Sequence, residues 1–586
     1  MSLPSENPAK PLHKNEQLKA ESHFLRGHIR RDLDDPSTGT VTEESSQLLK
    51  FHGVYPQDDR DLRNLRRKEG KEKAYIFMAR VRVPGGVCST AQWLALDEVA
   101  DRRGNGTLKI TNRQSFQLHG VLKGGLTPAL RELNEVLLRT IAACGDINRN
   151  VMCNPNPEDS QLHGKVWKTA KAVSDYFLPR TRGYYEIFLD ERLVTGGEPE
   201  HEPIYGPTYM PRKFKIVFAI PPSNDVDVYA HDLGFIAIAD PEGVLLGYNV
   251  TVGGGMGMSH GQIETYPRLG ELLGFCRPDQ VIDVAEKILS VQRDYGDRTD
   301  RKHARLKYTI ADRGLAWFRE ETEGRLGYGL GAPRRFEFTH TGDRLGWVDC
   351  PNGTSHYTLF IENGRVKDAP EYRLKTALRE IARVHRGEYR LTPNQHLIIA
   401  GVPTEEKAVI EGLLKEYRLD TANGATALRL NSMACVALPT CGLALAESER
   451  YLPDLVTALD AEIEAAGLRA DAIIIRMTGC PNGCGRPYLA EIGIVGRAPG
   501  KYHVYLGAAF NGSRMNALYR PNVPAAELVP LLRPLLRRYA QERLEGERFG
   551  DFAIRTGYVN PTGAPADFHE AKATAPSAGG GAGVQV

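Results

Sequence analysis

A sixteen-residue stretch occurs twice in the chain, and this repeat restricts the possible folds more than any other feature. Residues 106–121 align with residues 387–402 at five identical positions, and most other positions keep their polar or apolar character. Each copy has two short alternating runs around a Thr-x-x-Gln turn, a pattern that predicts two paired strands. Each copy also follows an amphipathic stretch with helical spacing, 90–103 or 372–385.

A second pair of similar segments follows the two copies in the same order. Residues 230–238 lead to 246–254, and residues 490–496 lead to 502–507. Chance could produce one match this short, but the shared order of both pairs favours a duplicated chain. We therefore expect an internally duplicated α+β fold, with two ferredoxin-like half-units and two larger α/β units around a central cofactor cleft.

The duplication and the composition of the two ends predict the domain boundaries. The first 73 residues are densely charged with both signs and carry only short apolar islands, so we expect an arm without its own core. The last residues are rich in Ala, Gly and Pro and are expected to be disordered. The expected parts are an extended N-terminal arm (1–73), a first ferredoxin-like half (74–145), a first α/β domain (146–345), a second ferredoxin-like half (346–425), a second α/β domain with four paired cysteines (426–563) and a tail (564–586).

The overall composition argues against large polyanionic partners. The chain is 41% hydrophobic and 25% charged, with a formal net charge of +2, so nothing favours a nucleic acid or an anionic membrane as partner. Neither an apolar signal region nor a run of about eighteen apolar residues occurs, which indicates a soluble cytoplasmic protein. Because the cytosol keeps thiols reduced, some of the nine cysteines are expected to bind metal or to do redox chemistry.

Four cysteines occur as two pairs, with five residues between the first two and three between the others. Helical spacing from Leu452 to Ile463 and an apolar strand at 473–477 fill the gap between the pairs. Small residues beside the thiols let backbone amides approach the sulfur atoms, which tunes the potential of a bound cluster. The spacing leaves three interpretations open: an iron–sulfur cluster, a structural zinc site, whose pairs are usually closer, or buried cysteines without metal. The four are Cys435, Cys441, Cys480 and Cys484.

The segment Thr478-Gly-Cys-Pro-Asn-Gly-Cys484, together with the two cysteine spacings, resembles the signature of the sirohaem sulfite and nitrite reductases. The resemblance extends from about residue 24 to 561 and makes the zinc interpretation much less attractive. It implies that all four cysteines hold one [4Fe-4S] cluster and that Cys484 also ligates the sirohaem iron. The other five cysteines occur singly and are expected in the core.

Sulfite and nitrite are small oxyanions, and their reduction consumes protons, so the pocket needs fixed cations that can also pass protons. The resemblance assigns this role to Arg82, Arg149, Lys213 and Lys215. Strand alternation in Lys-Phe-Lys would place both ammonium groups on one face. Without the motif, each of these residues would be read as an ordinary surface charge.

The carboxylates of sirohaem require a further basic or polar lining. Candidates come from both repeat copies and from the end of the first α/β domain, although alternating polar residues on a strand are often only half exposed. The glycine run 253–257 could place backbone amides against the macrocycle, but glycines alone do not indicate a phosphate loop. The candidates are Arg113, Gln117, Arg305, Lys307, Asn394 and Gln395.

Two features favour sulfite over nitrite as substrate. Nitrite reductases of the family often carry Asn where this chain has Lys215, and the arm segments 24–27, 34–36 and 47–61 resemble the haemoprotein subunits of NADPH-dependent assimilatory sulfite reductases. The resemblance implies six-electron reduction of sulfite in cysteine biosynthesis. It also implies a flavoprotein alpha subunit carrying FAD, FMN and the NADPH site, which the arm could help to dock. A sirohaem nitrite reductase and a zinc-stabilised binding module remain the rival hypotheses.

Overall fold

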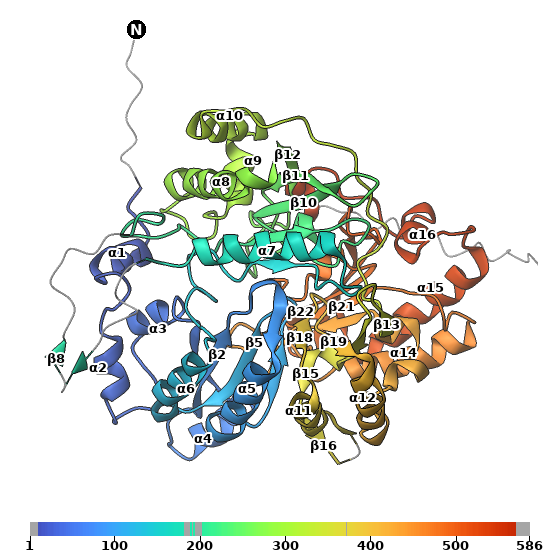
Figure 1. The fold of residues 1–586 in the computed structure, drawn as a ribbon, viewed down its shortest axis with the longest axis horizontal. Helices are drawn as coiled ribbons and strands as arrows, with labels where there is room; N and C mark the ends of the chain where they lie inside the picture. The colour runs from blue at the N-terminus through green and yellow to red at the C-terminus, as the bar shows by residue number, and fades with distance from the viewer. Residues whose placement is uncertain (1–9, 181–187, 190–191, 194–201, 371, 570–586) are drawn as a thin grey trace, which may run out of the picture.

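The computed structural model describes residues 10–180, 188–189, 192–193, 202–370 and 372–569, and four five-stranded sheets dominate it (Figure 1). Two sheets belong to the ferredoxin-like halves and two to the α/β units, so the structure is the duplicated α+β fold expected from the repeat. The first ferredoxin-like sheet has the order β1-β2-β5-β4-β15 and the second β13-β14-β19-β18-β3. Their strands are β1 Val54–Asp58, β2 Tyr75–Val81, β3 Val87–Ser89, β4 Leu108–Ile110, β5 Phe116–Val121, β13 Gly346–Asp349, β14 Thr354–Leu359, β15 Arg365–Val366, β18 Glu388–Leu391 and β19 Leu397–Pro403.

Each ferredoxin-like half lends one strand to the sheet of the other half. Strand β3 leaves the first half and pairs with β18, while β15 leaves the second half and pairs with β4. A 3-10 turn precedes each exchanged strand, Pro84–Gly86 before β3 and Glu362–Gly364 before β15. The reciprocal exchange is strong support for the duplication.

The two ferredoxin-like halves share one hydrophobic core. Helix α5 (Thr90–Arg103) covers the first sheet and packs on α11 (Leu374–Val384) of the second half. The sequence starts α5 with a capping box, because Ser89 accepts from the amide of Gln92 while the Gln92 side chain accepts from the amide of Ser89. From α5, fully buried Trp93 meets the Tyr389 ring edge-on, with 5.0 Å between centroids. The halves therefore form one body.

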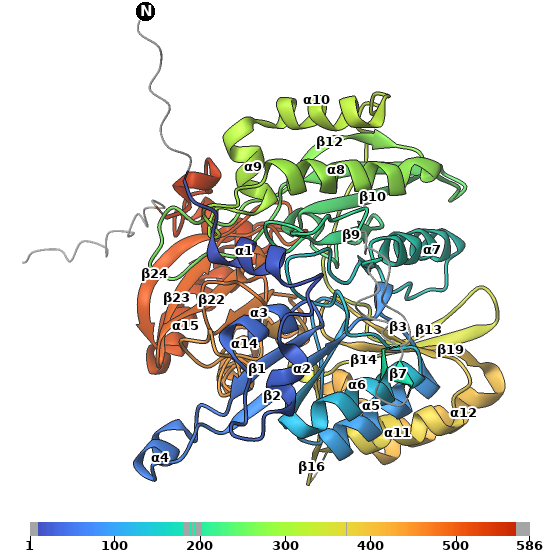
Figure 2. The same ribbon diagram turned by 90° about the vertical axis from the view of Figure 1, so that its left-hand side faces the viewer.

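The two α/β units repeat one topology, in which two parallel pairings precede two antiparallel ones. Helices cover both sheets (Figures 1 and 2). The first unit contains β6 Met152–Cys153, β9 Ile216–Ala219, β10 Leu233–Ala239, β11 Leu245–Val252, β12 Glu271–Cys276 and helices α7 Gln161–Tyr176, α8 Val281–Tyr295, α9 Leu306–Arg313 and α10 Leu315–Leu326. The second contains β20 Ser432–Ala434, β21 Ile475–Thr478, β22 Ile492–Ala498, β23 Lys501–Leu506, β24 Ala517–Pro524 and helices α14 Leu452–Ala465, α15 Leu528–Glu542 and α16 Phe549–Arg555.

The arm differs from the extended segment expected of it. Its described part forms four short helices, and β1 joins the first ferredoxin-like sheet. The arm packs its apolar islands, such as Leu48 and Phe51, into the core of the first α/β unit. Buried polar contacts add to this packing: the Lys19 ammonium lies 2.6 Å from the Glu16 carboxylate and donates to the carbonyl oxygen of Met210. The helices are α1 Lys14–Glu21, α2 Ile29–Asp34, α3 Glu43–Leu49 and α4 Arg63–Lys68.

The tail is ordered farther than its composition predicts. Residues Pro565–His569 form a 3-10 turn, and fully buried Phe568 stacks on Tyr505 with 5.6 Å between ring centroids. The remainder of the expected tail, 570–586, lies outside the described residues. The aromatic side chain therefore fixes the chain beyond residue 563, where a compositional boundary was expected.

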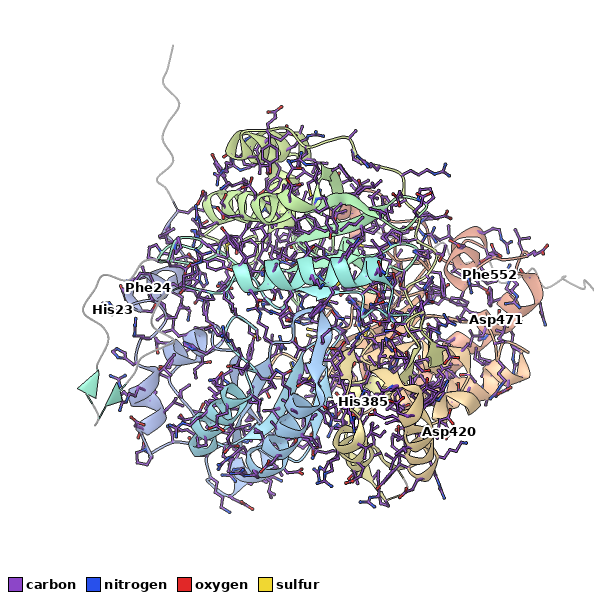
Figure 3. All side chains as sticks on the ribbon, viewed as in Figure 1. His23, Phe24, His385, Asp420, Asp471 and Phe552 are labelled. Atoms are coloured by element: carbon purple, nitrogen blue, oxygen red, sulfur yellow. The ribbon has the colours of Figure 1, made fainter. Side chains whose placement is uncertain are left out.

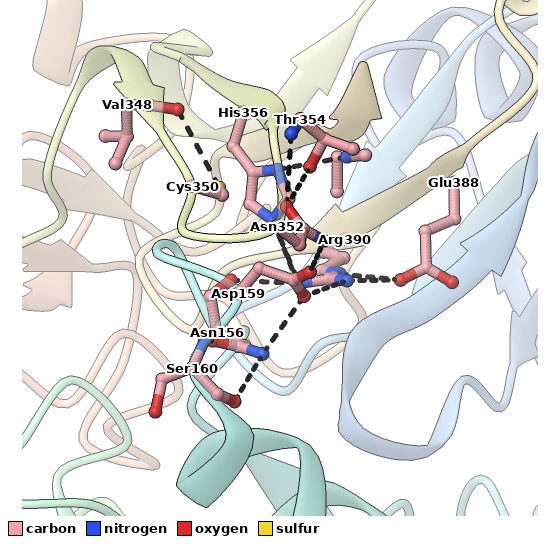
Figure 4. Close-up of polar contacts among 12 residues, drawn as sticks. Asn156, Asp159, Ser160, Val348, Cys350, Asn352, Thr354, His356, Glu388 and Arg390 are labelled. Carbon is pink, nitrogen blue, oxygen red and sulfur yellow. Dashed lines mark hydrogen bonds and ion pairs between the residues drawn. The ribbon is translucent and has the colours of Figure 1, made fainter. Parts of the chain in front are cut away.

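Polar contacts join the first α/β unit to the second ferredoxin-like half. Before α7, the Asp159 carboxylate accepts from the Asn352 amide at 2.5 Å, and the Arg390 guanidinium donates to the carbonyl oxygen of Asn156 at 2.8 Å (Figure 4). Figure 3 shows side chains filling the space between the sheets, with His385 at the end of α11 and Phe552 on α16. The four units thus pack as one molecule.

Candidate active site

The four paired cysteines lie on two loops that follow neighbouring parallel strands, β20 and β21. Cys435 comes directly after β20, and Cys480 and Cys484 lie in the turn after β21. The carboxyl ends of parallel strands meet at one edge of a sheet, which brings the loops together. All nine cysteines are free thiols, and Cys484 is the exposed one. As expected, the five single cysteines are buried.

The thiols lie close enough to influence one another. Burial, followed by the charges of Cys484 and Cys480, raises the pKa of Cys435. Burial and Cys484 raise the pKa of Cys480 to about 12. The amide of Gly479 donates to the Cys435 sulfur at 3.4 Å, and the Asn482 side chain to the Cys480 sulfur at 3.5 Å. Such donors stabilise thiolates and tune a cluster.

Among the residues that the structure describes, no group of three or more His, Cys, Asp or Glu side chains has the arrangement of metal ligands. The four sulfur atoms are therefore neighbours without being gathered around one point. The donor set nevertheless consists of thiols alone, with amide donors directed at two of them. This chemistry fits an iron–sulfur cluster.

Lys213 and Lys215 approach the thiol loops from the segment before β9. Both are largely enclosed and only partly exposed, while Phe214 between them is fully buried, as the alternation predicted. Burial lowers the pKa of Lys213 well below its usual value, and the Arg212 and Arg305 guanidinium groups lower it further. The pKa of Lys215 is also well below its usual value, because burial lowers it and the neighbouring cations lower it further.

Arg113, Arg149 and Cys484 belong to the same surroundings. Burial, and next the charge of Arg149, lower the pKa of Arg113 to about 9. Arg113 and Arg149 are also among the cations that lower the pKa values of Lys215 and Lys213, respectively. The Cys484 thiol acts on Lys213 in the opposite direction. Three of the predicted substrate residues, Arg149, Lys213 and Lys215, therefore lie in one group with Arg113, and Lys213 links this group to Cys484.

Arg80 joins this group, and the sequence reasoning missed it. Although burial lowers its pKa, the charges of Cys144, Tyr55 and Cys484 outweigh that effect and raise the pKa. Gln117, opposite Arg80 in the β2–β5 pair, accepts from the Arg80 Nε at 3.1 Å once its amide is oriented to satisfy both neighbours. Gln117 thus positions Arg80. We call Arg80, Arg113, Arg149, Lys213 and Lys215 the basic cluster.

Arg82 lies elsewhere, although it was expected in the pocket. Its guanidinium donates to the backbone and hydroxyl oxygens of Ser174 on α7. Burial lowers its pKa to about 10, and the titratable groups around it are Tyr205, Asp175 and Arg139. Strand β2 ends at Val81, so the alternation that would place Arg82 beside Arg80 stops there.

Arg305 and Lys307 contact the backbone of the glycine run 253–257. Arg305 forms a two-oxygen contact with Asp232, each at 3.0 Å, and the Lys307 ammonium donates to the carbonyl oxygens of Gly255 and Gly257 at 3.2 and 2.8 Å. A Cβ atom on Gly255 would lie 2.8 Å from the Arg305 guanidinium, so a larger residue there would displace this side chain. These two predicted residues therefore brace the site.

The residues predicted from the second repeat copy do not join the basic cluster. The Asn394 amide donates to the Thr341 carbonyl oxygen and to Asp343, each at 2.9 Å. Gln395 donates to the carbonyl oxygen of Ala434, just before Cys435. Its counterpart Gln114 has the same left-handed backbone and donates to the end of β6, so both glutamines hold strand ends.

Arg486 joins all four units at the site, and sequence reasoning missed it. Its guanidinium contacts the Asp227 carboxylate at 2.8 Å and donates to the carbonyl oxygens of Pro393 at 2.8 Å and Asn112 at 3.3 Å. The Asn112 amide in turn donates to the carbonyl oxygen of Cys484 at 2.5 Å. The position of Arg486, two residues after Cys484, was its only sequence signal.

Two further features of the molecule are the apolarity of its helices and the position of its hollows. The chain contains no helix, within the described residues, that is long and apolar enough to cross a membrane. One hollow is lined by α1, α3 and the Gly145–Asp146 turn, and it adjoins the basic cluster because the Arg149 guanidinium donates to the carbonyl oxygen of Gly145 at 3.2 Å. Another hollow is lined by α10. Lys213 and Arg80 beside Cys484 mark the site.

Known proteins share this architecture. The family descriptions "nitrite and sulphite reductase 4Fe-4S domain" and "nitrite/sulfite reductase ferredoxin-like half domain" match residues 169–329, and residues 68–136 and 351–417, respectively. The solved structure of the Mycobacterium tuberculosis NirA protein superposes with a TM-score of 0.76 at 26% identity, covering 93% of this chain and 97% of that one.

Curated relatives are similar over nearly their whole length. The sulfite reductase (NADPH) hemoprotein beta-component of Geobacillus kaustophilus is 57% identical, over 95% of this chain and 97% of the relative. The protein of the same name from Staphylococcus epidermidis is 54% identical, over 96% and 98%. These matches confirm the resemblance seen in the cysteine motif, and the chain belongs to the nitrite and sulphite reductase family.

Proposed function

We propose that the chain is the haemoprotein subunit of an assimilatory, NADPH-dependent sulfite reductase and reduces sulfite to sulfide. The observation that carries this proposal is that the basic cluster reaches the exposed thiol of Cys484 through Arg80 and Lys213, beside three further thiols. Cys435, Cys441, Cys480 and Cys484 would hold a [4Fe-4S] cluster, with Cys484 shared with sirohaem. The bound cofactors would supply electrons and an iron centre for the anion.

The basic cluster has the chemistry that sulfite reduction requires. Six electrons and seven protons convert a sulfite ion into hydrosulfide and three waters. Arg80 and Arg149 supply permanent charge and forked donors for the oxyanion. Lys213 and Lys215 have depressed pKa values, so their ammonium groups can release protons to oxygens that leave as water. Arg113 adds charge suited to the carboxylates of sirohaem.

Electrons would come from NADPH through a flavoprotein alpha subunit carrying FAD and FMN, in support of cysteine biosynthesis. Support comes from the names of the curated relatives, which are beta-components of NADPH sulfite reductases. The nine free thiols suit a reducing compartment, so we place the protein in the cytoplasm.

Replacing Lys215 tests the choice of anion. Sulfite carries more negative charge than nitrite, so the loss of one cation should weaken its binding more. We expect Lys215→Asn to lower sulfite turnover about tenfold more than nitrite turnover. Both rates are measured with reduced methyl viologen on one cofactor-replete preparation of each protein. Equal losses, or a larger loss with nitrite, would contradict a selective role, and wild-type turnover of nitrite alone would contradict the proposed substrate.

A further inference from the structure

Helix α4 in the arm presents cations and apolar side chains to solvent. None of its residues is buried, and Figure 2 shows it standing out from the body of the molecule. Arg63 pairs with Asp58, but Arg66, Arg67 and Lys68 form no ion pair with any carboxylate in the described part of the chain. Leu65 on the helix and Leu62 just before it are 54% and 40% exposed.

The segment leading into α4 is bonded directly to a loop of the thiol site. The Arg60 guanidinium donates to the carbonyl oxygens of Cys441 and Ala444 at 3.2 and 2.5 Å, and the Arg60 amide donates to that of Pro439. Between these acceptors, Leu443 is 67% exposed. Helix α4 and Leu62 follow Arg60 in the chain, and Leu443 lies in the loop that Arg60 contacts. We call α4, Leu62 and Leu443 the donor patch.

The donor patch has the composition of a protein interface, with exposed leucines next to arginines. Its exposed cations attract an acidic surface from a distance and orient it before contact, while the leucines exclude water at short range. The net charge of the chain is only +2, so the attraction comes from this local group. A partner seated here would contact the loop that carries Cys441.

We propose that the donor patch binds an acidic face of the flavin-bearing electron donor, so that electrons enter the protein past the Cys441 loop. This inference rests on the proposed function, because a reductase needs such a donor. The sequence alone assigns donor binding to the arm as a whole. Here the binding segment is restricted to residues 60–68, with the addition of Leu443, which is distant in the sequence.

Charge reversal tests the proposal. The triple variant Arg66→Glu, Arg67→Glu and Lys68→Glu should raise the KM for the flavoprotein in NADPH-driven sulfite reduction roughly tenfold or more, with kcat changed little. The dependence of that KM on salt should weaken as well. Turnover with reduced methyl viologen should stay the same, because this small donor needs no docking surface.

Matched controls make the result specific. Lys165→Glu, Lys168→Glu and Lys171→Glu together reverse three exposed charges on α7 and should leave both activities unchanged. Leu65→Ser should raise the same KM without altering any charge. An unchanged NADPH-driven rate in the first triple variant, or equal losses with both donors, would overturn the proposal. If the first triple variant differed from the wild-type protein only in nonspecific binding to polyanions, the proposal would be overturned too. If wild-type protein failed to reduce sulfite with methyl viologen, the proposed function itself would fail.

Discussion

Replacing Cys484 with serine is expected to lower sulfite turnover by more than about 10³-fold. Removal of one positioned donor from a reaction site already costs about 10²–10³ in rate, and here the proposed shared ligand of cluster and haem is lost. The absorption spectrum should change together with the rate, because the two cofactors would no longer be coupled through this sulfur. The measurement compares turnover and visible spectrum with those of the wild-type protein.

Cys88→Ser provides the matched control. Cys88 is a buried thiol of the ferredoxin-like core, and burial raises its pKa. This variant should keep its spectrum and its turnover, with a modest loss of stability. A Cys484→Ser protein with a normal spectrum and rate would contradict the ligand assignment.

The second large effect is expected at Arg80. Arg80→Gln should lower sulfite turnover by about 10²–10³ while both cofactors remain bound, since it removes a positioned charge beside Cys484. Arg82→Gln should instead lower the melting temperature, because Arg82 holds Ser174 on α7. Turnover per bound haem should be nearly unchanged in that variant.

The contrast between these two arginines is measured on preparations with known sirohaem content. A large loss in Arg82→Gln, together with a normal rate in Arg80→Gln, would restore the assignment expected from sequence. Equal losses would place both side chains at the anion.

The repeat in the sequence predicted much of the fold, because its strands and helices depend on local patterning. The expected helix at 90–103 is α5, and the expected strands of both copies are β4, β5, β18 and β19. The exchange of β3 and β15 could not be predicted, since strands of two or three residues carry too little pattern. The arm helices depend on contacts with distant parts of the chain, both apolar, as for Leu48 in the core, and ionic, as for Glu16 with Arg298.

The site was predictable where residue type alone determines the chemistry. The spacing of the thiols made Cys435, Cys441, Cys480 and Cys484 the predicted cluster ligands, which the spectrum of the protein tests, and the Lys-Phe-Lys alternation predicted the burial of Phe214. The choice between Arg80 and Arg82 depends on where β2 ends, and a sequence reading places strand ends poorly. Asn394 was a candidate from the second repeat copy, but its amide bonds to Thr341, whereas its counterpart Arg113 in the first copy belongs to the basic cluster.

The central claim is that four thiols of this chain hold an iron–sulfur cluster coupled to sirohaem. The most direct measurement is the visible spectrum of the purified protein, combined with analysis of iron, acid-labile sulfide and zinc. Soret and chlorin-type bands, with about four cluster irons and four sulfides per chain plus one haem iron, are the expected result. A colourless protein containing stoichiometric zinc would contradict the claim.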